Sequence, residues 1–132
     1  MSANTTGVTE GVSASFKEET AGQLNDKEGY LVEPGTDEGT VKLLVTPGNE
    51  IGTVEAKLSP DSPIVNIRLL GSPGTARYVA GDAIAKMGGF KAAAGGKVIA
   101  ATTGRLLGKS LFQGNTQDGQ RFLAISLVEN KA

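Results

Sequence analysis

Short alternating runs of apolar and polar residues, separated by glycine-rich turns, constrain the fold of this chain most strongly. Val54, Ala56 and Leu58 alternate with polar residues, which is the period of a strand with one buried face. The 132 residues include 19 glycines, about twice the usual share, which suits many tight turns. A helix could compete over the Ala-rich stretch 76–87, but Gly81 interrupts it. The pattern predicts a mainly β fold, a small β-barrel or β-sandwich of short strands with glycine-rich turns.

The alternation also places the individual strands. In the last expected strand, at 121–128, Leu123, Ile125 and Leu127 share one face, while Phe122, Ala124 and Val128 share the other. Apolar residues on both faces predict a strand that is buried on both sides. We expect strands at residues 41–45, 54–58, 65–69, 83–87, 90–93, 97–100, 105–112 and 121–128.

The first 24 residues differ from the rest in composition. They are rich in Ser, Thr, Ala, Gly and Glu, and Val8, Val12 and Phe16 are their only larger apolar residues. A spacing of four would align these three on a helix, but the Gly, Ser and Thr content disfavours a stable one. We predict an extended or flexible N-terminal arm at 1–24, followed by a single β domain at 25–132. Val8, Val12 and Phe16 are predicted to anchor the arm on a partner, the alternative being a terminus without a role.

The chain lacks the residues that most enzymes and metal sites use. It contains no Cys and no His, which removes the thiol nucleophile, the commonest general base and the commonest transition-metal ligand. We therefore predict no catalytic, cofactor-binding or metal-binding residues, no cofactor, and a protein that is not an enzyme.

Three weaker chemical candidates have simpler explanations. Residues 104–110 look like a phosphate loop, but their spacing is one residue short and their flanks are typical of a strand. The adjacent carboxylates Glu18-Glu19 and Asp37-Glu38 are expected to be solvated. Asp82 follows a glycine, and we expect its carboxylate to accept backbone N–H groups in a turn.

The charges are divided between the two halves of the chain. Residues 1–60 have a net charge of −6 and residues 61–132 a net charge of +5, so the two can complement each other unless they are simply scattered over solvated faces. The basic residues form no run and aromatic residues make up 5%, so we expect no nucleic-acid partner. The sequence contains neither a signal peptide nor an apolar run of membrane-spanning length, which predicts a soluble protein made in a cytoplasm, without a membrane partner.

One family shares the order of motifs in the last fifty residues. These motifs are AGDAI at 80–84, GGKV at 95–98, TGRLLGKSL at 103–111, the glycine at 119 and the closing apolar strand. This part of the chain resembles the capsid cement proteins, or head decoration proteins, of tailed bacteriophages, and region 25–71 resembles them loosely. The long acidic N-terminal region departs from the shorter members.

The resemblance implies a small, mainly β protein on the outside of the expanded phage head. Its partner would be the major capsid protein, whose neighbouring subunits it would clamp against the pressure of the packaged DNA, and it would act as a homotrimer. It would be made in the cytoplasm of the host bacterium and reside on the capsid surface of the virion. Two alternatives remain: a structural adaptor of a phage tail or fibre, and a small trimeric β-barrel nucleotide hydrolase, which would need several carboxylates for Mg²⁺.

Overall fold

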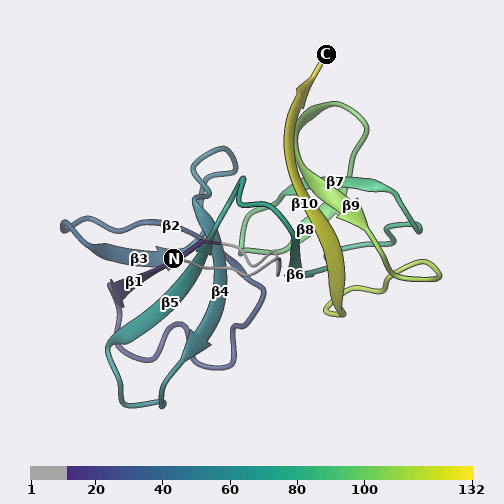
Figure 1. Ribbon diagram of the computed structural model, residues 1–132. Helices are drawn as coiled ribbons and strands as arrows, with labels where there is room; N and C mark the ends of the chain where they lie inside the picture. Colours follow the sequence, from purple (N-terminus) through teal and green to yellow (C-terminus); the bar gives the residue numbers. More distant parts are fainter. Residues whose placement is uncertain (1–11) are drawn as a thin grey trace, which may run out of the picture.

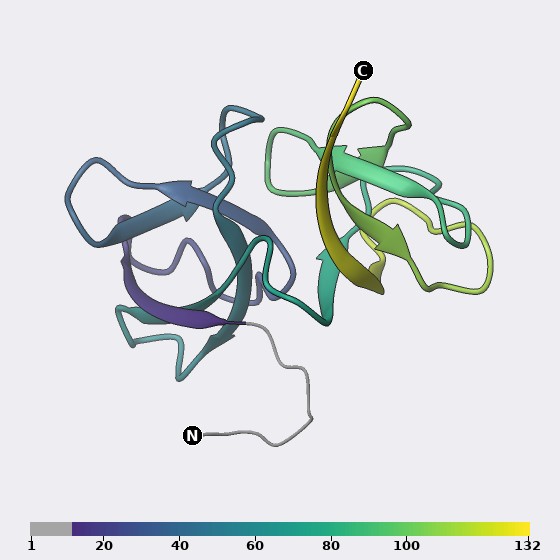
Figure 2. The same cartoon turned by 45° about the horizontal axis from the view of Figure 1, so that its top comes forward.

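The computed structural model describes residues 12–132, which form ten β-strands and no helix. The mainly β fold expected from the sequence is therefore confirmed. The strands are β1 (Ser13–Glu18), β2 (Leu31–Pro34), β3 (Thr40–Leu43), β4 (Gly52–Lys57), β5 (Ile64–Leu69), β6 (Thr75–Val79), β7 (Gly89–Ala92), β8 (Val98–Ala100), β9 (Gly104–Ser110) and β10 (Arg121–Lys131). They form two sheets that lie side by side (Figures 1 and 2).

The first sheet is a closed barrel with the strand order β1-β3-β2-β4-β5. Its closure depends on β1, which pairs antiparallel with β5 and parallel with β3. In β5 the predicted alternation holds, since Val65 and Ile67 point inward. In β4 it holds only at Val54, because a bulge between Val54 and Ala56 leaves Ala56 and Leu58 exposed instead of buried. The barrel core contains Leu24, Val32, Val41, Val54, Val65 and Ile67.

The position of β1 differs from the predicted arm. Residues 13–18 are extended, as the arm was expected to be, but they pair along their length within the barrel, for example Phe16 with Val65. Their hydrogen bonds and the packing of Phe16 against the barrel core order them without a partner. The spacing of four between Val8, Val12 and Phe16 is that of a helix and not of a strand. Apart from Phe16, the residues of β1 have short or charged side chains, so the sequence contains no strand signal there.

The second sheet has the strand order β6-β10-β9-β7-β8. Its core is built on three aromatic rings in edge-to-face or tilted contact: the centroids of Tyr78 and Phe90 lie 4.8 Å apart, and those of Phe90 and Phe122 5.3 Å apart. Such aromatic clusters contribute beyond the area they bury. Since each ring comes from a different strand, the cluster holds β6, β7 and β10 together.

The strand expected at 83–87 is wrong. This segment is a loop before β7, in which Ile84 inserts into the core and exchanges hydrogen bonds with Thr116. Met87 has a φ of 61°, which is incompatible with a continuous strand. The Ala-rich stretch beside it contains strand β6 rather than a helix.

The barrel and the second sheet share a core. Leu31 and Leu44, from the barrel half of the chain, belong to the same buried cluster as the aromatic rings of the second sheet. Backbone hydrogen bonds cross the junction from the Leu31 N–H to the Gly96 carbonyl, 2.8 Å, and from the Gly95 N–H to the Leu44 carbonyl, 2.9 Å. Arg121 adds two bonds to backbone carbonyls of residues 26 and 28. The two sheets are thus joined by apolar packing and by hydrogen bonds.

Candidate functional site

The most exposed apolar surface of the second sheet is a row on β10, which we call the β10 apolar face: Leu123, Ile125 and Leu127. These residues are 44%, 37% and 44% exposed, while Phe122 before them and Ala124 and Ser126 between them are buried. The sequence predicted burial on both sides of this strand, and that prediction is wrong for the isolated chain. One side of β10 covers the core. On the opposite side, barrel carbonyls of Asp26 and Glu28 bind Arg121, while Leu123, Ile125 and Leu127 stay partly exposed.

The β10 apolar face lies within the sheet rather than at its edge. β10 is flanked by β6 and β9, so the row is continued on both sides by the residues directly opposite it. Arg77 lies opposite Leu123, while Thr75 and Lys109 lie opposite Ile125. The face therefore combines apolar side chains with a border of positive charge, an arrangement suited to contact with another protein.

The charge division seen in the sequence follows the two sheets. Residues 12–70, which include the barrel, carry ten acidic and five basic side chains, a net charge of −5. Residues 71–132, which include the second sheet, carry three acidic and eight basic side chains, a net charge of +5. The β10 apolar face thus belongs to the basic half of the molecule, and an acidic partner surface would complement it.

The three predicted arm anchors do not form one surface in the part of the chain that the structure describes. Val12 is exposed just before β1, whereas Phe16 is half-buried against the barrel core. Val8 lies outside the described residues. Whether these residues contact a partner stays a prediction. The sequence missed the β10 apolar face as a site because alternation identifies two faces of a strand but not which one is covered.

The barrel carboxylates bind backbone N–H groups and cations of the protein itself. Glu18 was expected to be solvated, but it is buried: it pairs with Lys57 at 2.7 Å and accepts bonds from two backbone N–H groups. Burial acts to raise the pKa of Glu18, but the Lys57 hydrogen bond and these N–H groups outweigh it and leave the pKa lowered. Asp37 and Glu38 are exposed, as expected.

Two further candidates from the sequence have structural roles. Asp82 accepts a hydrogen bond from the Ala100 N–H at 3.0 Å, so its carboxylate binds a backbone N–H as expected, but this group belongs to β8 and not to a local turn. Residues 104–110 form β9, so they are a strand and not a phosphate loop. Among residues 12–132, no group of three or more Asp or Glu side chains is placed to hold a metal ion.

No protein-family model matches the sequence. No curated protein matches it either. Within the described range, no helix is long and apolar enough to cross a membrane.

Proposed function

We propose that this chain is a capsid cement protein of a tailed bacteriophage. It binds the outer surface of the expanded head as a homotrimer and clamps neighbouring subunits of the major capsid protein. The resemblance of residues 80–128 to head decoration proteins supports this role, as does the all-β architecture. The observation that carries the proposal is the β10 apolar face, a surface suited to protein contact whose flanking residues are mainly basic.

Stabilisation of a shell requires only differential binding. A protein that contacts two capsid subunits at their spacing in the expanded shell, but not at their spacing in the unexpanded one, stabilises the expanded form by its binding free energy. Many identical copies, each with a modest contact area, add up to a large effect on the whole shell. In this scheme the β10 apolar face supplies the apolar contact and its basic border selects an acidic capsid surface.

The trimer would be closed by a contact between unlike surfaces of neighbouring copies. The acidic barrel half and the basic second-sheet half offer such a pair, because their net charges are −5 and +5. We expect self-association or head binding to weaken between low and high salt, as measured by sedimentation and by head pelleting. If neither self-association nor head binding changed with salt concentration, charge complementarity would not contribute to either contact.

Binding to purified heads tests the proposal. The protein should bind expanded heads more tightly than unexpanded ones, saturate them in multiples of three copies, and raise the temperature at which they release DNA. Equal binding to both forms, or no binding, would refute a cement role. Saturation at a few copies per particle would instead indicate a tail or fibre adaptor.

A pair of variants tests the surface. Leu127→Asp places a charge in the β10 apolar face and should weaken head binding at least about tenfold, since the burial of an apolar side chain contributes about 1.5 kcal/mol or more. Leu58→Asp is the matched control, because Leu58 is 92% exposed and lies beyond β4 on the barrel. If both variants bind heads equally well, the β10 apolar face is not the contact surface.

A further inference from the structure

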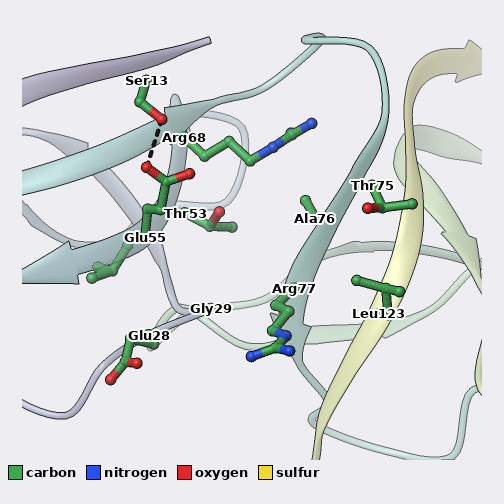
Figure 3. A pocket seen from close by; sticks show the side chains of 11 residues that line it. Ser13, Glu28, Gly29, Thr53, Glu55, Arg68, Thr75, Ala76, Arg77 and Leu123 are labelled. Atoms are coloured by element: carbon green, nitrogen blue, oxygen red, sulfur yellow. Dashed lines mark hydrogen bonds between the residues drawn. The ribbon is translucent and has the colours of Figure 1, made fainter. Parts of the chain in front are cut away.

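A groove lies between the barrel and the second sheet, beside the β10 apolar face (Figure 3). Its volume is about 670 Å³, within the range of sites that bind ligands. The barrel side presents Thr53, Glu55 and Arg68, and the second sheet presents Thr75, Arg77 and Leu123. The barrel wall of the groove is therefore polar and carries one acidic and one basic side chain, and the opposite wall is the edge of a sheet.

Arg68 is the unusual residue of this groove. It is only 7% exposed, yet none of the carboxylates in residues 12–132 lies within ion-pair distance of it. Its guanidinium reaches across the groove toward β6 and donates one hydrogen bond, from Nη2 to the Pro73 carbonyl at 2.9 Å. A buried cation without a counterion is costly. A ligand carboxylate at this place would relieve that cost and could accept the remaining guanidinium N–H groups.

The nearest acidic residue of the groove does not serve as that counterion. The carboxylate of Glu55 accepts a hydrogen bond from the Ser13 hydroxyl at 2.7 Å, and Figure 3 shows it directed toward Ser13 while the Arg68 side chain extends away from it. The fold thus holds Glu55 on β4 and the guanidinium of Arg68 apart, and the guanidinium remains available on the β6 side.

The edge of β6 supplies the second half of the site. β6 pairs only with β10 and ends the sheet on this side. Near one end of β6 the Ala80 N–H donates to the Gln120 carbonyl, just before β10, and at the other end the Gly74 carbonyl accepts from the Ser126 N–H of β10. Since these directions alternate along an antiparallel strand, the backbone groups of Thr75 and Arg77 point away from β10 and into the groove. No other described residue forms a backbone hydrogen bond with them.

We propose that this groove binds an extended polypeptide segment that carries a carboxylate side chain. The segment adds a strand to the free edge of β6, and its carboxylate pairs with Arg68. Gly29 of the barrel already lies against the far end of β6, since a Cβ on it would be 3.5 Å from the Arg77 carbonyl oxygen. The open edge therefore runs from Thr75 to Arg77, and a segment of about three residues, about 10 Å of extended chain, fills it. Glu28 and Glu55 also line the groove, which disfavours a polyphosphate chain such as a nucleic acid. This site adjoins the surface proposed to bind the capsid and shares Leu123 and Arg77 with it, whereas Arg68 belongs to the groove alone.

Two synthetic peptides, acetylated and amidated at their ends, test the proposal: Thr-Val-Glu-Val-Thr and the same sequence with Gln in place of Glu. Titration into isotope-labelled protein, followed by NMR, should shift the backbone amides of Thr75 and Arg77 and the side-chain Nε of Arg68. The Glu peptide should bind at least about tenfold more tightly than the Gln peptide, because only the former supplies a charged partner. Arg68→Gln should abolish that difference, whereas Lys91→Gln, which removes an exposed charge on β7, should preserve it.

The outcomes separate this proposal from its alternatives. If the wild-type protein bound the Glu peptide and the Gln peptide with equal affinity, the role of Arg68 would be overturned. This comparison does not depend on whether the Arg68→Gln variant folds. Absence of shifts at Thr75 and Arg77 would overturn strand addition to β6. If a short thymidine oligonucleotide shifted the same amides more strongly than the peptides do, the ligand of the groove would be a polyanion and not a peptide. Because the experiment uses the isolated protein, its failure leaves the head-binding test untouched.

Discussion

Three glutamates of the barrel half show how single residues stabilise the loops of this fold. Glu33 accepts hydrogen bonds from the N–H groups of Val45 and Thr46, and Glu50 accepts one from Gly48 and pairs with Arg105 at 2.7 Å. Glu18 makes the equivalent bonds at the loop after β1. Loop N–H groups that have no strand partner are thereby satisfied. A charged residue in a polar sequence therefore gives no signal of whether it is solvated or buried with partners.

Removal of the cation beside Glu18 should destabilise the protein. Lys57→Met leaves the buried carboxylate without its ion pair, and we expect the free energy of unfolding to fall by about 2–3 kcal/mol, measured by urea denaturation. Lys97→Met is the control, because Lys97 and Asp118 form an exposed pair whose loss should change stability little. Equal losses in the two variants would show that the Glu18 pair is no stronger than a surface contact.

Glu33 should make the fold sensitive to acid. The N–H groups of Thr46 and Val45 lower the pKa of Glu33 below its ordinary value. A carboxyl with a lowered folded-state pKa stabilises the protein above its unfolded-state pKa of about 4.3, and this contribution is lost as the pH falls through the folded-state value. Urea denaturation between pH 7 and pH 3 should show a steeper loss of stability below about pH 4.5 for the wild type than for Glu33→Gln. Parallel profiles would exclude Glu33 as a source of the acid sensitivity.

At the scale of elements, the sequence predicts the strands that have one apolar face over several residues. The predictions at 54–58 and 65–69 correspond to β4 and β5, and that at 121–128 corresponds to β10. In β5 and β10 the bulky apolar residues at alternate positions include a buried row, so local patterning and burial agree there. In β4 they agree only at Val54, because a bulge between Val54 and Ala56 shifts the register and leaves Ala56 and Leu58 exposed. Three strands, β1, β2 and β6, were missed. The inward positions of β1 and β6 include small residues such as Ala76, which give little periodic signal, and β2 has only four residues.

The loop before β7 could not be found from local pattern. Ile84 is fully buried there, but its place is fixed by hydrogen bonds with Thr116, which is 32 residues away in the chain. The left-handed backbone at Met87 is likewise imposed by its surroundings, since methionine has no preference for it. Tertiary contacts decide this segment, and a run of apolar residues alone therefore suggested a strand.

The turn between β7 and β8 should be sensitive to a single methyl group. Gly96 has a φ of 90°, and a Cβ there would lie 2.9 Å from the Leu31 carbonyl, which belongs to the barrel half. Gly95 also has a φ of 90°, but a Cβ there would meet nothing within 4 Å. Both alanine variants share the backbone strain of about 1–2 kcal/mol, and only Gly96→Ala adds the clash at the junction. Gly96→Ala should therefore unfold at a lower urea concentration than Gly95→Ala, and the reverse order would contradict the close approach.

At the scale of the whole molecule, two sheets of opposite net charge are joined through one buried cluster and leave three apolar side chains on one face of β10 partly exposed. The sequence showed the charge division and the two apolar rows of β10, but it could not show which row packs on the aromatic rings. That choice follows from the path of the chain, which places Tyr78 and Phe90 on the side of Phe122 and Ala124. The candidate site is therefore a consequence of the assembled sheet and not of a local motif.

The shared core predicts that the barrel and the second sheet unfold together. Ile67 is fully buried in the barrel cluster, so Ile67→Ala should lower the free energy of unfolding by about 3 kcal/mol. If Leu31 and Leu44 couple the sheets, native-state hydrogen exchange should show the same loss for the slowest amides of β9 and β10 as for those of β4 and β5. Leu58→Ala, at an exposed position, should leave both sets unchanged. A loss of protection confined to β4 and β5 would mean that the second sheet stays folded while the barrel opens. The hydrogen bonds at Gly95 and Gly96 would then connect two parts that are stable independently of each other.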